Sequence, residues 1–505
     1  MNQPLPNSFW PVLNGESRTL WRLLLPALLW CLLLPLAGLR AQAVLYNPVG
    51  AGQSFAVVLR PDGTLLAWGY NGNGQLGNGT STSRLLPASV AAPASAALGT
   101  AWTSVVVGWS HALARRSDNT LWGWGYNVDG QLGDGTVTAR PSPVLVPTPT
   151  GAAVGTTWGP ISTNTHTLAL RSDNSLWAWG ANFSGQLGDG TTTARLSAIA
   201  VATPMGAAPG TTWTKAEVGR EHSLALRSDG TLWAWGDNRY GMLGDGTSTP
   251  KRTPALVPTP AGAAAGTTWT DMAAGYYFSL ALRSDGTLWA WGENVYGELG
   301  TGSLSRSLVP VVVVTPTTAG AGTRWTRVVA SENHTVALRS DGSLWAWGYN
   351  FHGQLGNNTT LSRSTPVREI TNSTWSQIAT CQSHTMAVRA GTGAVFATGS
   401  NFYGQLGNGN TTNSLVFLAS AASVTATRPA AAPLAGVYPN PARAQCQLPA
   451  LPAGSTVQLV DLRGRVVRQQ AAALTLDLTG LASGLYLLTA LAPGQAPRIT
   501  RLVVE

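Results

Sequence analysis

The sequence predicts an all-β protein: a seven-bladed β-propeller followed by a small C-terminal β-sandwich. Three observations predict this fold. A Trp-Gly pair recurs at steps of 56, 55, 56, 56 and 56 residues, and a Thr-Gly pair follows 51 residues after the last of them. Each copy contains short stretches of alternating apolar and polar residues with no helical period. The repeat stops near residue 420, where a different pattern begins.

One copy shows how a blade is built. Residues 213–219 and 222–227 alternate, and the Ser-Asp-Gly that follows gives a hairpin turn. Residues 231–235 resume the alternation, and a Gly-Met-Leu-Gly turn at 241–244 precedes a fourth apolar stretch that ends near Val257. Four strands at a period of about 50 residues are typical of a propeller blade.

The repeats define the predicted domains. The ring is expected to run from residue 44 to about 420, because residues 46–52 supply the opening strand of the first copy and residues 415–418 the last strand of the seventh. Closing the ring removes exposed sheet edges. Residues 421–436 are rich in Ala, Ser, Thr and Pro and are expected to be a linker. Residues 437–505 contain five or six alternating strands, enough for a small sandwich.

The repeat carries recognisable motifs: Gly-x-x-His-(Ser/Thr)-x-Ala-Leu, an Asp-Gly turn, Leu-Trp-x-Trp-Gly and Gly-Gln-Leu-Gly. In these features the middle of the chain resembles the regulator-of-chromosome-condensation repeat family. The resemblance implies a seven-bladed propeller. It implies little about chemistry, because members of that family serve as nucleotide-exchange factors, as β-lactamase inhibitors and as modules of unknown partner.

The N-terminus has the features of a signal peptide over residues 1–43. Arg18 and Arg22 precede an apolar run over 23–36, and Ala-Gln-Ala at 41–43 offers a cleavage site. The run is short for a membrane span, so no span is expected after cleavage. The two remaining cysteines are expected in different domains, which argues against a disulfide framework.

The tail resembles the type A C-terminal sorting domain of the type IX secretion system. The resemblance rests on Tyr-Pro-Asn-Pro at 438–441, Asp-x-x-Gly-Arg at 461–465, Gly-Leu-Tyr at 484–486 and the terminal strand. It implies Sec export to the periplasm and then passage through the outer membrane, with the type IX machinery as partner. The mature protein would be released outside the cell or held at the outer-membrane surface.

No motif in the sequence is expected to hold a cofactor or a metal ion. The Gly-x-Gly-x-x-Gly at 72–77 is followed by no helix that could receive a pyrophosphate, so it is interpreted as a turn. Asn and Asp around the Gly-x-Leu-Gly turns, such as Asn127 and Asp134, lack calcium-loop spacing and are interpreted as turn caps. The net charge of +9 is spread along the chain, so nucleic acid is not an expected partner.

Histidine recurs at one position of the repeat, which raises a metal hypothesis. Equivalent positions on seven blades cannot all come within about 2 Å of one ion, and phenylalanine replaces histidine in two copies. A packing and hydrogen-bonding role is therefore expected. The residues at this position are His111, His166, His222, His334, His384, Phe55 and Phe278.

The two residues before the histidine position vary between copies and should line one rim of the ring. Trp, Tyr and Arg dominate binding hot spots, and these types occur here. The alternative interpretation is that these are unconstrained loop residues. The candidate ligand-binding residues are Trp109, Arg220, Glu221, Tyr276, Tyr277 and Glu332.

The function that the sequence favours is that of a secreted or surface-bound monomeric binding module for a protein or glycan, without catalytic activity. No nucleophile elbow, phosphate loop or zinc-protease motif is present. The alternative is an extracellular propeller enzyme acting on polysaccharide, which would need two carboxylates about 5–9.5 Å apart. Nucleotide exchange is suggested by fold analogy alone.

Overall fold

The computed structural model describes residues 48–93, 95–97, 99–423, 442–451, 455–461, 466–471, 473–491 and 498–505. The predicted signal peptide and most of the predicted linker lie outside these ranges, as do the Tyr-Pro-Asn-Pro opening of the tail and the turn at 462–465. In the part of the chain that is described, no helix is long and apolar enough to cross a membrane.

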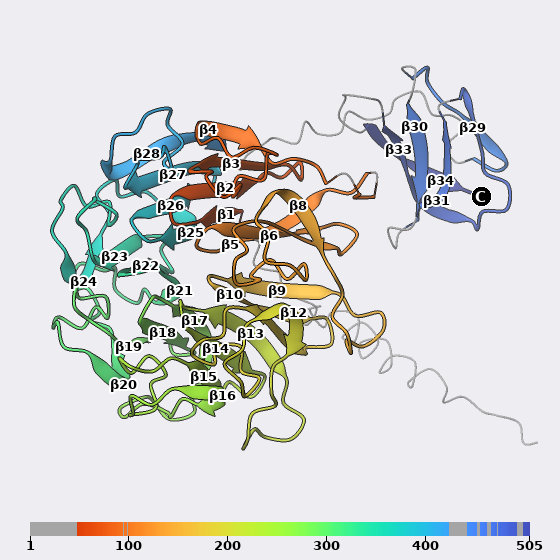
Figure 1. Cartoon of the computed structure of the whole chain (residues 1–505). Coiled ribbons are helices and arrows are strands. Elements are labelled where there is room, and N and C mark those ends of the chain that lie inside the picture. The colour runs from red at the N-terminus through yellow and green to blue at the C-terminus, as the bar shows by residue number, and fades with distance from the viewer. Residues whose placement is uncertain are drawn as a thin grey trace, which may run out of the picture. The chain divides into compact units, whose positions relative to one another are not determined.

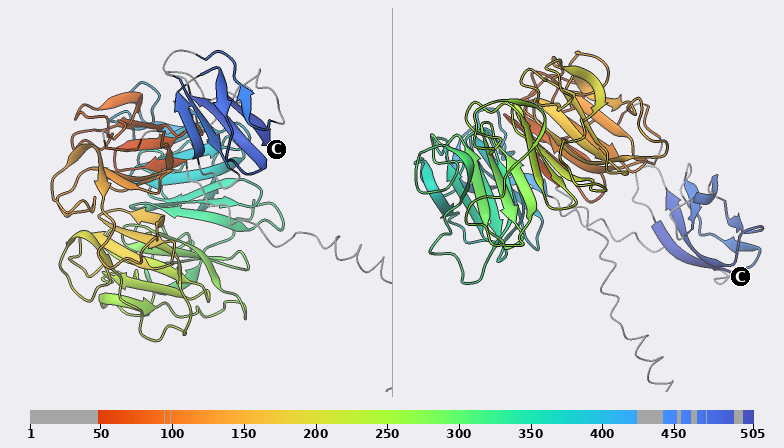
Figure 2. Two further views of the ribbon diagram at one scale, coloured as in Figure 1. Left: turned by 90° about the vertical axis from the view of Figure 1, so that its right-hand side faces the viewer. Right: turned by 90° about the horizontal axis from the view of Figure 1, so that it is seen from below.

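The predicted propeller is present as seven four-stranded antiparallel sheets. The strands follow one another around a ring, and the colour order in Figures 1 and 2 brings the last blade beside the first. In each blade the first strand contacts the first strands of the neighbouring blades and the fourth lies at the periphery. Blades 1 to 4 comprise β1 (Val49–Ala51), β2 (Phe55–Leu59), β3 (Leu65–Gly69) and β4 (Arg84–Ser89); β5 (Trp102–Val107), β6 (His111–Arg116), β7 (Leu121–Gly125) and β8 (Arg140–Val146); β9 (Trp158–Thr163), β10 (His166–Arg171), β11 (Leu176–Gly180) and β12 (Arg195–Ala200); and β13 (Trp213–Val218), β14 (His222–Arg227), β15 (Leu232–Gly236) and β16 (Lys251–Leu256). Blades 5 to 7 comprise β17 (Trp269–Ala274), β18 (Phe278–Arg283), β19 (Leu288–Gly292) and β20 (Ser307–Val312); β21 (Trp325–Ala330), β22 (His334–Arg339), β23 (Leu344–Gly348) and β24 (Arg363–Arg368); and β25 (Trp375–Cys381), β26 (His384–Arg389), β27 (Ala394–Gly399) and β28 (Ser414–Ser423).

Every blade is built from four consecutive strands, so the ring closes without exchanging a strand between blade 7 and blade 1. Among the described residues, the closing seam is held by packed side chains and by two hydrogen bonds. Trp68 donates its indole N–H to the carbonyl of Gln405 at 2.9 Å, and the Gly409 amide donates to the carbonyl of Leu85 at 3.3 Å. β28 ends at Ser423, slightly beyond the predicted end of the ring.

The same bonds recur at the other seams, which explains why the Trp-Gly and Gly-x-Leu-Gly motifs repeat in phase. Trp235, for example, donates to the carbonyl of Gln186 in the preceding blade at 2.8 Å. In blade 7 threonine stands in place of this tryptophan, and the Thr398 hydroxyl donates to the Gly353 carbonyl at 2.9 Å. Both residues of the Trp233–Trp235 pair are buried in one apolar cluster between blades, as expected for core residues.

The arginine that ends the second strand fixes the opposite end of the blade. Its guanidinium lies over the tryptophan that begins the first strand, as Arg227 lies 4.9 Å from the ring centroid of Trp213. The same guanidinium donates to the carbonyl and hydroxyl oxygens of Thr211. In blades 2 to 7 the connector before the blade is therefore held by a cation–π contact and by hydrogen bonds from this arginine.

The histidine position joins neighbouring blades. His166 Nε2 lies 2.7 Å from Ser223 Oγ of the next blade, and the Ser223 hydroxyl also donates to the Gln186 carbonyl. At the closing seam the residue equivalent to Ser223 is Ala56. Neither ring nitrogen of the buried His384 has a hydrogen-bond partner among the described protein groups. The seam between blades 7 and 1 therefore lacks a bond that other seams have.

Replacing Ala56 with serine should repair this seam. The new hydroxyl would bond His384 Nε2 and raise the free energy of unfolding by about 1 kcal/mol. The urea midpoint measures this gain. Ala112→Ser is the matched control, because Ala112 follows a blade that carries Phe55 and no imidazole can bond the new hydroxyl. An equal gain in both variants would contradict the assignment.

The C-terminal domain is all-β, as predicted. A four-stranded sheet has the order β31-β30-β33-β34, and a two-stranded sheet pairs β29 with β32. Cys446 is buried among the apolar residues of this domain, and both described cysteines are free thiols. The strands are β29 (Gln445–Gln447), β30 (Thr456–Val460), β31 (Val466–Ala471), β32 (Thr475–Asp477), β33 (Gly484–Leu491) and β34 (Arg498–Val504).

Candidate binding face

Two sets of loops share one end of the ring. The loop between the first and second strands (the a–b loop) and the loop between the third and fourth strands (the c–d loop) both begin there, because the start of the second strand pairs with the end of the third. In blade 4 this pairing joins His222 to Gly236. The candidate residues named from the sequence all lie in a–b loops.

Three of those candidates form a contact that crosses the ring; we call them the hub cluster. The ring centroids of Trp109 in blade 2 and Tyr276 in blade 5 are 6.1 Å apart. The Arg220 guanidinium of blade 4 lies 4.0 Å from the ring centroid of Tyr276. Blades 2 and 5 are not neighbours, so side chains from these two blades can meet only across the axis of the ring. All three side chains are partly exposed.

Charged and aromatic groups extend the hub cluster over blades 4 and 5. The Glu221 carboxylate pairs with Arg220 at 3.8 Å and with Arg239 at 3.0 Å. Tyr277 packs at 90° against Tyr276, with centroids 4.5 Å apart, and the Arg239 guanidinium lies 5.7 Å from the Tyr277 ring. Tyr277 and Glu221 are therefore contiguous with the hub cluster.

Glu332 of blade 6 faces the same region. Burial raises the pKa of its carboxyl, while a hydrogen bond from Gln382 and the charge of Arg220 act in the opposite direction. The structure therefore places all six candidate residues in one connected region, five by direct contact and Glu332 through its interaction with Arg220.

The a–b loops are tied to one another before any ligand is present. The Gln53 amide donates to the Trp109 carbonyl at 2.9 Å, and the Tyr276 amide donates to the Ser331 carbonyl at 3.0 Å. The Thr165 hydroxyl donates to the Arg220 carbonyl. Each bond joins neighbouring blades, so the hub residues are held in place. A preorganised surface loses less conformational entropy on binding.

The c–d loops add apolar residues that the sequence analysis did not assign to the site. The residue after the recurring asparagine of this loop is large, apolar and more than half exposed in five blades; we call these residues the apolar tips. They are Val128, Phe183, Val295, Phe351 and Phe402. The sequence already shows that this position of the repeat varies freely, because Gly72 and Arg239 occupy it in the other two copies. The fold therefore does not require an apolar residue there.

The asparagine itself explains how the tips can be exposed. In blade 2 the Asn127 amide donates to the carbonyls of Thr136 and Thr138, and the Leu132 amide donates to its carbonyl oxygen. Asp134 accepts from the amide and hydroxyl of Thr136. These polar groups fix the loop from inside.

Among the described residues, no three His, Cys, Asp or Glu side chains gather as a metal site.

The histidines lie beneath this face and are uncharged. Burial lowers the pKa of His111, His166, His222 and His334 to about 3 and that of His384 to about 4. Except for His384, each lies within hydrogen-bond distance of hydroxyl groups, as in the bond of 2.9 Å between His222 Nε2 and Ser279 Oγ. This geometry agrees with the packing and hydrogen-bonding role expected from the sequence.

Glu298 is an exception within the Gly-x-Leu-Gly turns. Five other copies carry glutamine at this position and one carries methionine. Glu298 is buried, and its Oε2 accepts from the Tyr296 amide at 2.7 Å, much as Gln186 Oε1 accepts from the Ser184 amide. Burial, together with the nearby Glu293, raises the pKa of Glu298 to about 7.

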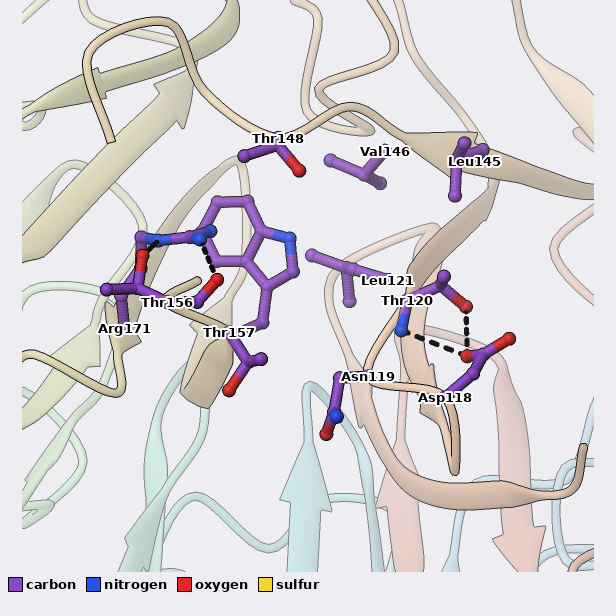
Figure 3. A pocket seen from close by; sticks show the side chains of 11 residues that line it. Asp118, Asn119, Thr120, Leu121, Leu145, Val146, Thr148, Thr156, Thr157 and Arg171 are labelled. Atoms are coloured by element: carbon purple, nitrogen blue, oxygen red, sulfur yellow. Dashed lines mark hydrogen bonds between the residues drawn. The ribbon is translucent and has the colours of Figure 1, made fainter. Parts of the chain in front are cut away.

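A cavity of about 250 Å³ lies at the opposite end of the ring, between blades 2 and 3 (Figure 3). Its charged side chains are already occupied. Arg171 donates to the Thr156 carbonyl and hydroxyl, and Asp118 accepts from the Thr120 amide and hydroxyl. The cavity therefore offers fewer available polar groups than the face that carries the hub cluster.

The fold and its seams define a repeat propeller followed by a separate C-terminal domain, and comparison with protein families supports both parts. The family described as RCC1-like domain matches residues 160–447, and the regulator of chromosome condensation (RCC1) repeat matches residues 62–115 and 118–159. The secretion system C-terminal sorting domain matches residues 436–505. The chain belongs to the RCC1-like repeat family and carries a type IX sorting domain.

Similar proteins include the ultraviolet-B receptor UVR8 of Arabidopsis thaliana, which is 32% identical over 72% of this chain and 78% of the receptor. The E3 ubiquitin-protein ligase HERC2 of Homo sapiens is 29% identical over 69% of this chain, which spans only 7% of that ligase. Two solved structures are similar in fold. Human WBSCR16 has a TM-score of 0.59 at 22% identity, covering 68% of this chain and 86% of its own. Yeast RCC1 (Prp20), crystallised with Kap60, has a TM-score of 0.62 at 20% identity, and the match covers 76% of this chain and 85% of the yeast chain.

The sorting domain implies that the protein is secreted, to the cell surface or the extracellular space, and that it interacts with the type IX secretion machinery.

Proposed function

We propose that the propeller is an extracellular monomeric binding module and that its ligand, a protein or a glycan, contacts the hub cluster and the surrounding loops. The observation that carries the proposal is the contact of Trp109 and Arg220 with Tyr276. Trp, Tyr and Arg are the residue types on which binding energy concentrates. The loops that carry them are fixed by bonds between blades.

The proposal does not include catalysis. Hydrolysis of a polysaccharide would require a carboxyl group that can give up or take a proton beside a second carboxylate. Glu221, the acid in contact with the hub cluster, is occupied by Arg220, Arg239 and the hydroxyl of Ser184. Its surroundings therefore suit a positioning role for the arginines better than proton transfer.

Replacing Trp109, Arg220, Tyr276 and Tyr277 together with alanine should abolish ligand capture. Hot-spot truncations typically cost at least about 2 kcal/mol of binding each. The aromatic and cation–π interactions that these side chains make within the protein contribute about 0.5–1 kcal/mol each, so the variant should stay folded with a slightly lower melting temperature. Capture is measured with immobilised full-length mature protein against secreted and cell-surface fractions.

The control variant, Gln53→Ala with Ser383→Ala, changes the equivalent a–b loops of blades 1 and 7, outside the hub cluster, and should capture ligand as the wild type does. Equal capture by the four-residue variant and the wild type would overturn the proposed site. Turnover of a polysaccharide by the wild type, lost on replacing Glu221 or Glu332 with glutamine, would overturn the proposal that the protein is not an enzyme.

A further inference from the structure

Comparison of neighbouring blades shows an acid whose basic partner is missing. In blade 4, Asp237 follows the third strand and pairs with Arg239 two residues later, at 2.6 Å between Arg239 Nε and Asp237 Oδ2. In blade 5 the equivalent residues are Glu293 and Val295. The acid is kept, and the base is replaced by a valine that is 58% exposed. Among the described residues, Glu293 has no ion pair, and burial raises its pKa.

The seam between blades 5 and 6 also carries aromatic side chains. Tyr296, in the blade 5 loop, and Tyr349, which follows the third strand of blade 6, have ring centroids 4.8 Å apart. Phe351 stacks nearly parallel to Tyr349, at 6.4 Å and 18°. Burial raises the pKa of the Tyr349 phenol, and the nearby Tyr296 and Glu332 act in the same direction. The loops of this seam thus carry two tyrosine faces, two apolar tips and two carboxyl groups, of which Glu293 has no ion pair among the described residues.

The preceding seam shows what such a set of groups binds. There Tyr240 and Tyr277 have a centroid separation of 4.9 Å, and the Arg239 guanidinium lies over Tyr277 while it pairs with Asp237 and Glu221. A cation over an aromatic face and beside carboxylates is favourable on both counts. The seam between blades 5 and 6 offers the same two attractions, and Val295 stands there at the position of Arg239.

A third seam provides an internal contrast. Tyr70 of blade 1 and Tyr403 of blade 7 occupy the positions equivalent to Tyr349 and Tyr296, and their ring centroids are 4.9 Å apart. At this seam the residue equivalent to Glu293 is Ser400 of blade 7 and the residue equivalent to Glu332 is Gln53 of blade 1, and neither carries a charge. This seam has the aromatic pair without the carboxylates.

We propose that the seam between blades 5 and 6 binds a lysine or arginine side chain of a partner polypeptide, held by Glu293 and Glu332 against Tyr296 and Tyr349. The apolar tips Val295 and Phe351 contact apolar residues next to the bound cation. In the preceding seam Arg239 already pairs with Asp237 and Glu221, so those carboxylates are not available to a cation from a partner. The inference rests on the proposed binding function and names the chemistry of its ligand.

The test uses the full-length mature protein and a defined probe. The probe is a peptide that alternates lysine and phenylalanine with glycine spacers, and calorimetry measures its affinity. Acetylating the lysines removes the charge and keeps the length. The acetylated peptide should bind at least tenfold more weakly, and raising the salt concentration should weaken the unmodified peptide more than the acetylated one.

Two pairs of variants assign the site. Glu293→Gln with Glu332→Gln keeps the shape of both side chains and should weaken the lysine peptide at least tenfold, with an unchanged melting temperature. Tyr296→Ala with Tyr349→Ala should weaken it as well. Tyr70→Ala with Tyr403→Ala, the matched pair at the uncharged seam, should leave the affinity unchanged.

Equal binding of the acetylated and unmodified peptides would overturn the inference, and so would an unchanged affinity in the glutamine variant. Tighter binding of a chitosan oligosaccharide than of the peptide would show that the cation belongs to an amino sugar and would overturn the polypeptide assignment. If the hub variant abolishes ligand capture while the glutamine variant behaves as the wild type in both assays, the proposed function stands and this inference falls.

Discussion

His222→Phe should make the ring less stable at pH 7.5 and more stable than the wild type at pH 5. At the higher pH the variant loses the hydrogen bond between His222 Nε2 and Ser279 Oγ, a cost of about 1 kcal/mol. Phenylalanine fits, because it occupies the same position at Phe278. There a glycine, Gly275, lies against the ring as Gly219 lies against His222.

The reversal follows from the pKa of the buried imidazole. The pKa of His222 is about 3 in the folded protein and about 6.5 in the unfolded chain. As the pH falls from 6.5 to 3, the unfolded chain takes up a proton that the folded protein does not. The free energy of unfolding therefore falls by about 1.4 kcal/mol per pH unit, or about 2 kcal/mol at pH 5. Phenylalanine removes this loss. Four further buried histidines should make acid unfolding of the whole ring steep.

Urea midpoints at the two pH values measure the effect. Ser279→Ala is the control. It removes the same hydrogen bond, and also the bond from the Ser279 hydroxyl to the Met242 carbonyl, but leaves His222 buried and neutral. It should therefore destabilise the ring at both pH values with the pH dependence of the wild type. If His222→Phe kept that dependence, the imidazole would be charged in the folded protein and its burial would not set its protonation state.

Glu298→Gln should stabilise the protein by about 3 kcal/mol at pH 8 and by little at pH 4. The carboxyl has a pKa of about 7 when folded and of about 4.5 when unfolded. Between these values the folded protein retains a proton that the unfolded chain has lost, so the free energy of unfolding falls as the pH rises and levels off above pH 7. Glutamine has no proton to lose, and other copies accept it at the same position.

The reverse substitution provides the control. Gln186→Glu places a carboxyl at the equivalent turn of blade 3 and should destabilise the protein at pH 8 while leaving it nearly unchanged at pH 4. Thermal unfolding at both pH values measures the two variants. Equal stability of Glu298→Gln and the wild type at pH 8 would show that the Glu298 carboxylate is already compensated when ionised.

The blades were predictable from the sequence because their determinants are local. Strand alternation and the Ser-Asp-Gly turns fix the hairpins, and the phase of the repeat implies the ring. A packing role for His222, and not metal binding, was predictable because Phe278 occupies the equivalent position and phenylalanine cannot bind a metal ion. The position of the candidate residues in one set of loops was also predictable.

The contact between Trp109 and Tyr276 was not predictable, because it depends on how far each side chain reaches across the ring. The unpaired acid at Glu293 was equally hidden. It stands out only when the structure shows that Arg239 neutralises the equivalent Asp237. The apolar tips could not be recognised from the sequence because their exposure was unknown. The sequence shows phenylalanine at positions 183, 351 and 402, and only the packing of the loops shows that these rings face solvent.

The uninterrupted order of strands in each blade has a consequence for how the chain assembles. A blade can form as soon as its own four strands are available, since no partner strand must arrive from elsewhere. Contacts between successive blades join segments about one repeat apart, whereas the bond from Trp68 to Gln405 spans 337 residues. Loop closure over such a distance is the entropically costly step. The propeller can therefore form progressively, from one blade to the next, with joining of its two ends as the final and slowest event.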